Sequence, residues 1–399
     1  MNATAQPGLS LSALLAACAD DAWDDGIRID TELVPLGGAG APVKPAVYAT
    51  GLFQHDRRWE SPQHDEPADV IVIDNVPSQA NRLEEALRLH RAALSLPEFL
   101  LDFDGLPLPS HLPARLSSLQ FPHRNADAYL RDARLGNEDF LKSELGEAIF
   151  AATAQTCGPL VAWFPQSLLY GFWQSHLGKK RHNAKHARAW VSEIVGWRPA
   201  ATDTQVQGLK GDPLNLRVDE TVTSNPDDRS HWNLGKNGDV AGGKAERLAG
   251  IGHGRVPVSG DGVPGAVSFA RVTQRAMVSF AHLRRVRLGN GAGEAADAAL
   301  RALLVALGLH AHQLAFGHGF ALRSGAELRP QASEAMWLGA DGDHPCAVGD
   351  AETTAALLQE AAEHARAAGV PLDGWGQAPV MLTPNAALSE AIRRSWSAA

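Results

Sequence analysis

Residues 70–84 read Val-Ile-Val-Ile-Asp-Asn-Val-Pro-Ser-Gln-Ala-Asn-Arg-Leu-Glu, an apolar run that passes directly into a polar one. The four branched apolar residues at its start predict a buried strand. Apolar residues from 83 to 90 then recur at helical spacing, so we expect a helix with Ser78 as its N-cap. Because first-turn amides of a helix are unpaired, Ser78 and Gln79 stand where an anionic oxygen is readily held. The alternative interpretation is a well-capped helix without a ligand.

The rest of the chain mixes strand and helix patterns. Strands are expected at 27–34, 160–164, 267–288 and 316–328, and helices at 9–19, 138–155, 183–195, 294–314 and 351–368. Glycine, proline, asparagine and aspartate dominate residues 198–264, a composition typical of functional loops or mobile insertions. Because strands and helices follow no regular βαβ order, the pattern favours an α+β fold with large insertions.

Length and cysteine usage set further bounds. With 399 residues, 45% of them hydrophobic, the chain suffices for one large elaborated domain or two ordinary ones. Cys18, Cys157 and Cys346 show no CxxC spacing, which argues against a disulfide framework and favours a reducing cytoplasm. Residues 15–18 spell a bacterial lipobox, but the leader before them carries no Lys or Arg. No apolar stretch reaches the roughly 18–20 residues of a membrane span, so no membrane partner is expected.

The net charge of −9 is unevenly distributed along the chain. Two windows, 148–192 and 262–293, contain no acidic residue. They hold ten basic residues, namely Lys179, Lys180, Arg181, Lys185 and Arg188, then Arg271, Arg275, Arg284, Arg285 and Arg287. The other residues carry 26 basic and 45 acidic side chains, a net charge of −19. With aromatic residues such as Trp173 close by, these windows predict a groove that follows a polyanion backbone, although an exposed basic helix face gives the same pattern.

Catalytic motifs are absent from the sequence. There is no HExxH, GxSxG or Walker loop, and His176, His182 and His186 have no carboxylate beside them. His310 and His312 point to different faces of a predicted helix, and His318 falls beyond its end. We therefore expect no metal site and no cofactor. Gly319-Phe320-Ala321 matches only a fragment of the aromatic strand motif of RNA-recognition motifs.

Four segments together resemble a known family. They are Lys44-Pro45-Ala46-Val47-Tyr48, residues 74–84, the basic run ending in Arg188 with Ser192-Glu193-Ile194, and Leu322-Arg323-Ser324-Gly325 before Leu328. In this order they resemble the backbone RAMP subunit of type I-G (formerly I-U) CRISPR effector complexes. The similarity spans roughly residues 27–330, and Ser-Gln-Ala-Asn-Arg at 78–82 is its most specific part. The tail from Gln331 adds little.

The resemblance implies a modified ferredoxin-like (RRM-type) palm with large finger and thumb insertions. Residues 1–399 would form a single elaborated RAMP domain. Its core palm elements would lie at 27–110 and 267–330. Insertions that contain the basic segment and a flexible loop would occupy 165–264, and a C-terminal extension would occupy 331–399. The RNA-binding residues carried over by position or charge are Lys44, Ser78, Gln79, Asn81, Arg82, Lys179, Lys180, Arg181, Lys185, Arg188, Arg271 and Arg275.

The function implied is that of a non-catalytic, cytoplasmic subunit in antiviral defence. Copies of it would polymerise along CRISPR RNA and present the spacer for pairing with target DNA, so the protein needs backbone contacts rather than base readers. The other partners implied are a large subunit, a crRNA-processing end-cap subunit and a recruited helicase-nuclease.

Two alternatives from other classes stay open. One is a guide-directed ribonuclease of the type III kind, for which Asp212, Asp219, Asp227, Asp228 and Asp239 offer carboxylates, none of them in a recognisable motif. The other is an unrelated hydrolase that uses a metal bound by histidines.

Overall fold

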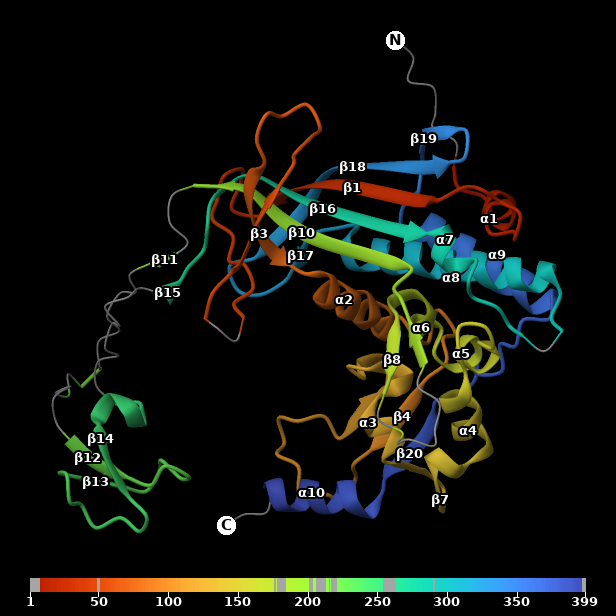
Figure 1. Ribbon diagram of the computed structural model, residues 1–399. Helices are drawn as coiled ribbons and strands as arrows, with labels where there is room; N and C mark the ends of the chain where they lie inside the picture. Colours follow the sequence, from red (N-terminus) through yellow and green to blue (C-terminus); the bar gives the residue numbers. More distant parts are fainter. Residues whose placement is uncertain are drawn as a thin grey trace.

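The computed structural model describes residues 8–48, 51–175, 177, 184–200, 204–205, 213–214, 216, 221–253, 263–289 and 291–396. Strands and helices alternate irregularly along the chain, and the largest sheet curls into a half-barrel with helices packed against one face (Figure 1). The expected α+β class is therefore confirmed.

The main sheet has eight strands, and every neighbouring pair in it is antiparallel. Its order is β17-β18-β1-β16-β10-β3-β2, with β19 paired to β18. The strands are β1 (Gly26–Pro35), β2 (Gln54–Arg58), β3 (Ala68–Asp74), β10 (Trp190–Pro199), β16 (Phe269–Ser279), β17 (Phe320–Ala321), β18 (Glu327–Gly339) and β19 (Gly342–Cys346). The strands expected at 27–34 and 70–73 are confirmed, and β10, from the range assigned to insertions, lies inside this sheet.

Helices cover one face of the main sheet. They are α1 (Leu11–Ala17), α2 (Val76–Leu89), α8 (Glu294–Phe316) and α9 (Ala351–Ala367), with the short α7 (Phe280–Leu283) following β16. α8 has the length and composition of a membrane-crossing helix, but 83% of its most apolar window is buried inside the protein. The expected helices at 9–19, 294–314 and 351–368 are confirmed.

A second, five-stranded sheet lies beyond the helices, in the order β5-β4-β20-β6-β7 (Figure 1). Its strands are β4 (Phe99–Asp102), β5 (Arg115–Ser117), β6 (Ala133–Leu135), β7 (Glu138–Asp139) and β20 (Val380–Pro384). Around it lie α3 (Ala128–Arg131), α4 (Glu144–Ala151), α5 (Gly158–Trp163), α6 (Pro165–Tyr170) and α10 (Ala386–Trp396), with 3-10 turns η1 (Ser118–Gln120), η2 (Arg124–Ala126) and η3 (Phe140–Lys142). The C-terminal extension thus supplies a central strand, because β20 pairs with both β4 and β6.

Three smaller units complete the described ranges. β8 (Phe172–Gln174) and β9 (Ala184–His186) form a hairpin, and β11 (Thr204–Gln205) pairs with β15 (Val263–Pro264). A three-stranded sheet of β12 (Thr221–Ser224), β13 (Trp232–Leu234) and β14 (Lys244–Arg247), followed by η4 (Leu248–Ile251), stands apart from the main body in Figure 1.

Three local predictions are wrong, and two more are wrong in part: residues 280–283 of the strand expected at 267–288 form the helix α7, and residues 138–139 of the helix expected at 138–155 form β7. Residues 160–164 were expected as a strand, but they overlap the helix α5, because a short apolar run carries no decisive periodicity. Residues 183–195 were expected as a helix, but form β9 and most of β10, whose branched and aromatic side chains suit a strand paired on both edges. The N-cap of α2 is Asn75 rather than Ser78, since the Asn75 side chain accepts from the Ser78 amide.

The contact between α8 and β10 yields a stability prediction. A Cβ placed on Gly308 would come within 2.7 Å of the buried Trp190 ring. Alanine at a helix position is favoured over glycine by about 1 kcal/mol, but overpacking costs about 1–3 kcal/mol. We expect Gly308→Ala to lower the free energy of unfolding, as measured by urea denaturation, and Gly308→Ala/Trp190→Leu to lose less than the two single changes together. A higher free energy of unfolding in Gly308→Ala would show that α8 and Trp190 do not pack this closely.

Candidate nucleic-acid interface

A buried carboxylate at the end of β3 organises the site. Asp74 is fully buried, and its two oxygens accept hydrogen bonds from four side chains. Ser78 Oγ donates at 2.9 Å and Gln79 Nε2 at 2.6 Å. Arg82 donates through Nε at 2.8 Å and Nη2 at 3.1 Å, and Arg323 donates through Nη2 at 3.0 Å. We call these five residues, Asp74, Ser78, Gln79, Arg82 and Arg323, the Asp74 cluster.

The cluster brings together segments that are far apart in the sequence. Arg323 Nη1 donates to the carbonyl oxygens of Lys44 and Ile73, each at 3.0 Å. The Lys44 amide donates to the carbonyl of Gly325 at 2.6 Å, and Asn75 Nδ2 donates to the Tyr48 hydroxyl at 2.8 Å. Residues 44–48, 74–84 and 322–325, three of the four segments on which the resemblance rests, therefore meet in one place.

The rim of the Asp74 cluster carries surplus positive charge. Arg82 and Arg323 share the single Asp74 carboxylate, and their side chains remain 27% and 25% exposed. Burial lowers the pKa of Arg323, with Arg82 adding to the effect and Asp74 opposing it, while burial and Asp74 together raise the pKa of Tyr48. The Lys44 ammonium has no ion pair among the residues that the structure describes. The arrangement suits an anionic oxygen at this rim.

Gln79 and Asn81 occupy opposite sides of α2. Gln79 is fully buried, and its Oε1 accepts from Gln274 Nε2 at 2.7 Å and from Ser192 Oγ at 3.4 Å. It thus ties α2 to the strands β16 and β10, and contact of its side chain with RNA stays a prediction. Asn81 lies two residues further along, about half a turn away, and is exposed on the solvent side.

The first acid-free window is described only in part. Lys179, Lys180 and Arg181 lie outside the described residues. Lys185 on β9 places its ammonium 5.6 Å from the centre of the Trp173 ring on β8, and Trp173 is 66% exposed. Arg188 is half-buried beside the buried Glu84–Arg124 ion pair. Burial and Arg124 lower the pKa of Arg188, and Glu84 opposes them, so this guanidinium faces an acid from α2.

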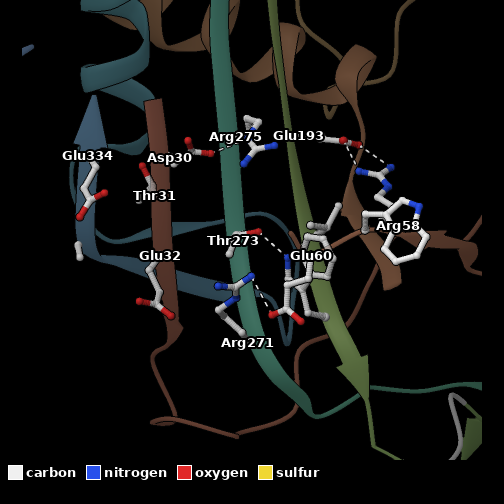
Figure 2. Close-up of a pocket in the computed structure, with 14 residues that line it drawn as sticks. Asp30, Thr31, Glu32, Arg58, Glu60, Glu193, Arg271, Thr273, Arg275 and Glu334 are labelled. Carbon is white, nitrogen blue, oxygen red and sulfur yellow. Dashed lines mark hydrogen bonds and ion pairs between the residues drawn. The ribbon is translucent and has the colours of Figure 1, made fainter. Parts of the chain in front are cut away.

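Two arginines of the second window, Arg271 and Arg275 on β16, lie on the open face of the main sheet. Figure 2 shows Arg271 and Arg275 beside a cavity of about 390 Å³, where Arg271 pairs with Glu60 at 3.1 Å and Arg275 with Asp30 at 2.6 Å. Arg58 and Glu193 form a further ion pair there. Acids from other segments therefore offset the positive charge of this window, which the sequence alone did not indicate. The roles of Arg271 and Arg275 in RNA binding stay predictions.

The histidines singled out in the sequence lie in different environments. His310 Nδ1 lies 3.0 Å from Thr354 Oγ1, and His312 packs against Trp190; burial lowers the pKa of both to about 4. His186 Nε2 lies 2.9 Å from the carbonyl of Leu168, and His318 is exposed, whereas His176 and His182 fall outside the described residues. Within the described ranges, no group of three His, Cys, Asp or Glu residues is placed to hold a metal ion.

The acids considered for a ribonuclease lie around the small β12–β14 sheet. Asp227, Asp228 and Asp239 are in its loops, and Asp228 pairs with His231 at 2.8 Å. Hydrogen bonds from Ser230, with a smaller contribution from His231, lower the pKa of Asp228. Asp212 and Asp219 lie outside the described residues.

Sequence reasoning missed the role of Asp74 and the ion pair of Arg323. An acid directly after a buried strand, eight residues before an arginine, was the available signal, because a buried carboxylate requires a cationic or hydrogen-bonding partner. The second arginine is 249 residues away, so its pairing with Asp74 followed only from the fold.

The Asp74 cluster predicts a large effect of one substitution. Asp74→Ala leaves two guanidinium groups without their shared acid, which is expected to cost about 3–5 kcal/mol of unfolding free energy. The matched control is Asp69→Ala on the same strand, where the side chain is 74% exposed and a change within about 0.5 kcal/mol is expected. Denaturant unfolding of both variants provides the measurement. Equal losses of unfolding free energy in the two variants would show that Asp74 does not organise the site.

One comparison with known proteins bears on this site. No curated protein matches the chain. Residues 27–199 match the model of the family described as CRISPR-associated protein GSU0053 (Cas_GSU0053). The matched range runs from β1 to β10 and includes the end of β3, the helix α2 and the β8–β9 hairpin. This match supports the assignment of the chain as a CRISPR-associated protein.

Proposed function

We propose that the chain is the backbone RAMP subunit of a type I-G CRISPR effector complex, which binds CRISPR RNA and polymerises along it. The observation that carries the proposal is the Asp74 cluster. Three remote segments meet there: Arg82 and Arg323 share one buried carboxylate, and Arg323 also binds the backbone carbonyl of Lys44. A rim with surplus positive charge that is fixed by the fold suits repeated contact with an RNA backbone.

The topology of the main sheet also supports a ferredoxin-like palm. Along the chain, β1, α2, β10, β16, α8 and β18 occur in a β-α-β-β-α-β order, with β2 and β3 inserted before α2, β4–β9 before β10, and β11–β15 before β16. In space the four strands lie side by side as β18-β1-β16-β10, all antiparallel, while β3 and β2 extend the sheet beyond β10. In this proposal the β8–β9 hairpin and the β12–β14 sheet are the finger and thumb insertions.

The proposed subunit holds the guide and leaves the recognition of sequence to base pairing. Backbone contacts position an RNA without reading it, so target DNA is selected by the exposed spacer. Its further partners are copies of itself, a large subunit and an end-cap subunit that processes the CRISPR RNA. The subunit is itself non-catalytic, and cleavage of DNA belongs to a recruited helicase-nuclease.

Guide retention tests the RNA contacts. We expect CRISPR RNA to stop co-purifying with the protein when four basic residues are changed together to alanine, namely Arg82, Lys179, Lys180 and Arg181. The ratio of absorbance at 260 and 280 nm and a denaturing gel measure the bound RNA. The fold should persist, because Arg323 still pairs with Asp74. If all four contact phosphates, the slope of log affinity against log salt falls by about 3.

The matched control for guide retention removes charge elsewhere. Lys236, Lys244 and Arg247 lie in or near the β12–β14 sheet, and changing them to alanine should leave the yield of bound RNA unchanged. Circular dichroism and a thermal melt confirm folding of both variants. Normal yield of full-length RNA with the fourfold variant would contradict the assigned residues.

The non-catalytic role has its own test. We expect the assembled complex, incubated with matching target RNA and Mg²⁺, to leave that RNA intact on a sequencing gel. Guide-directed cuts at regular spacing would instead favour the ribonuclease alternative. Asp228 and Asp239 are both exposed, so loss of those cuts in Asp228→Ala but not in Asp239→Ala would then locate the catalytic acid.

A further inference from the structure

The loop between α1 and β1 combines acidic side chains with one exposed indole. Residues 20–25 read Asp-Asp-Ala-Trp-Asp-Asp, and Trp23 is 82% exposed. Asp21 and Asp25 are exposed as well, and their carboxylates have no ion pair among the residues that the structure describes. Tryptophan is the kind of side chain that anchors protein interfaces, so the loop has the composition of a docking segment.

Hydrogen bonds hold this loop on both sides of the indole. Before it, the Asp20 carboxylate accepts from Arg287 at 2.9 Å and from the fully buried Arg301 at 2.7 Å. After it, the carbonyl and the carboxylate of Asp24 each accept one hydrogen bond, at 2.8 Å and 3.0 Å. Trp23 is therefore presented on a fixed backbone. Such an anchor is preorganised, so its docking orders little additional chain.

The same chain carries an apolar cavity that suits an indole. It has a volume of about 720 Å³ and lies between α2, the C-terminal end of α8 and β17. Leu89, Leu314 and Phe320 are part of its wall, and Leu89 is 66% exposed. Phe320 meets the buried Phe316 edge to face at a ring distance of 5.0 Å, which fixes the orientation of the Phe320 ring. A docked indole would thus meet an aromatic ring and apolar side chains.

The opening of the cavity is cationic where the loop is acidic. Arg82 lines the cavity, and it shares the single Asp74 carboxylate with Arg323, which leaves one positive charge in excess. The Glu85 carboxylate in the wall is held by Arg88 through two hydrogen bonds of 2.7 Å, so its charge is offset. Opposite charges on two surfaces favour their encounter and fix its orientation.

The loop and the cavity lie near opposite ends of β18 (Figure 1). The Asp25 amide donates to the carbonyl of Leu338, whereas Phe320 pairs with Leu328. These two positions of β18 are ten residues apart, roughly 33 Å at the rise of a strand. Because its loop is held in place, Trp23 does not reach the cavity of its own chain. The occupant that the charges and the shape suit is a second copy, in a head-to-tail contact.

We propose that, in the absence of RNA, the loop at 20–25 of one copy docks in this cavity of a second copy, with Trp23 beside Phe320 and its acidic neighbours near Arg82. The carboxylates then occupy the rim to which the proposed function assigns RNA phosphates, so RNA and the loop compete. The inference rests on the proposed function and adds to it a self-association that RNA releases. Free copies would thereby cover one another's positively charged rim.

Sedimentation velocity of the full chain, freed of nucleic acid, tests the self-association. We expect the wild type to form larger species as its concentration rises, and Trp23→Ala to stay monomeric because the anchor is lost. The matched control is Trp59→Ala, which removes another exposed indole and should associate as the wild type does. A single-stranded RNA too short to hold two copies, added in excess, should return the wild type to single RNA-bound chains.

A mixture of two variants tests the head-to-tail geometry. Ala321→Trp fills the mouth of the cavity from an exposed position on β17, and Trp23→Ala removes only the anchor. Each variant alone should be monomeric, whereas the mixture should form one-to-one dimers that grow no further. Circular dichroism checks the fold, and Ala351→Trp, at another exposed position of the wall, replaces Ala321→Trp if that variant is unfolded. A mixture that stays monomeric overturns the contact.

RNA affinity, measured by fluorescence anisotropy, separates this inference from the proposed function. Where about four in five cavities are occupied, the apparent affinity of the wild type falls about fivefold, because only the free fraction binds, and Trp23→Ala should restore it. The inference alone is overturned if the wild type is monomeric without RNA, associates equally after Trp23→Ala, or stays associated in excess short RNA. Failure of both proteins to bind RNA would overturn the proposed function as well.

Discussion

The ion pairing of one buried carboxylate holds the centre of this structure together. Asp74 has no access to water, and two guanidinium groups and two neutral donors together offset the cost of burying its charge. Those donors come from α2 and from the loop after β17. The same interaction therefore orients the first turn of α2 and fixes the loop at 322–325, and it leaves Nη1 of Arg82 without a partner among the described residues.

Charge distribution in space differs from charge distribution along the sequence. The window around Arg271 and Arg275 is free of acids in the sequence, yet Glu60 and Asp30 neutralise it on the open face of the sheet. At the Asp74 cluster the reverse holds, because one buried acid lies between two arginines whose side chains are 27% and 25% exposed. A net charge of −9 thus says little about where a polyanion is able to bind.

Much of the fold was predictable where periodicity was strong and long. The helix at 294–314 and the strands at 27–34 and 70–73 follow from apolar patterns that tertiary contacts reinforce. The errors arose where the partner decided the outcome, as for β10, which is a strand because β16 and β3 pair with both its edges. For the site, residues 78–82 were recognised as special, but the pairing of Asp74 with Arg323 depends on long-range topology that no local pattern encodes.

The placement of β20 has a consequence for how the chain is made. β4 and β6 are separated by about thirty residues, yet they are joined only through β20, which enters between them from the last twenty residues. During synthesis the edges of β4 and β6 therefore stay open until β20, which begins 245 residues after the end of β6, has left the ribosome. Loop-closure entropy makes so distant a pairing slow, and open strand edges invite association with other chains. The second sheet is thus late to close, and a stop codon before Val380 would leave it without its central strand.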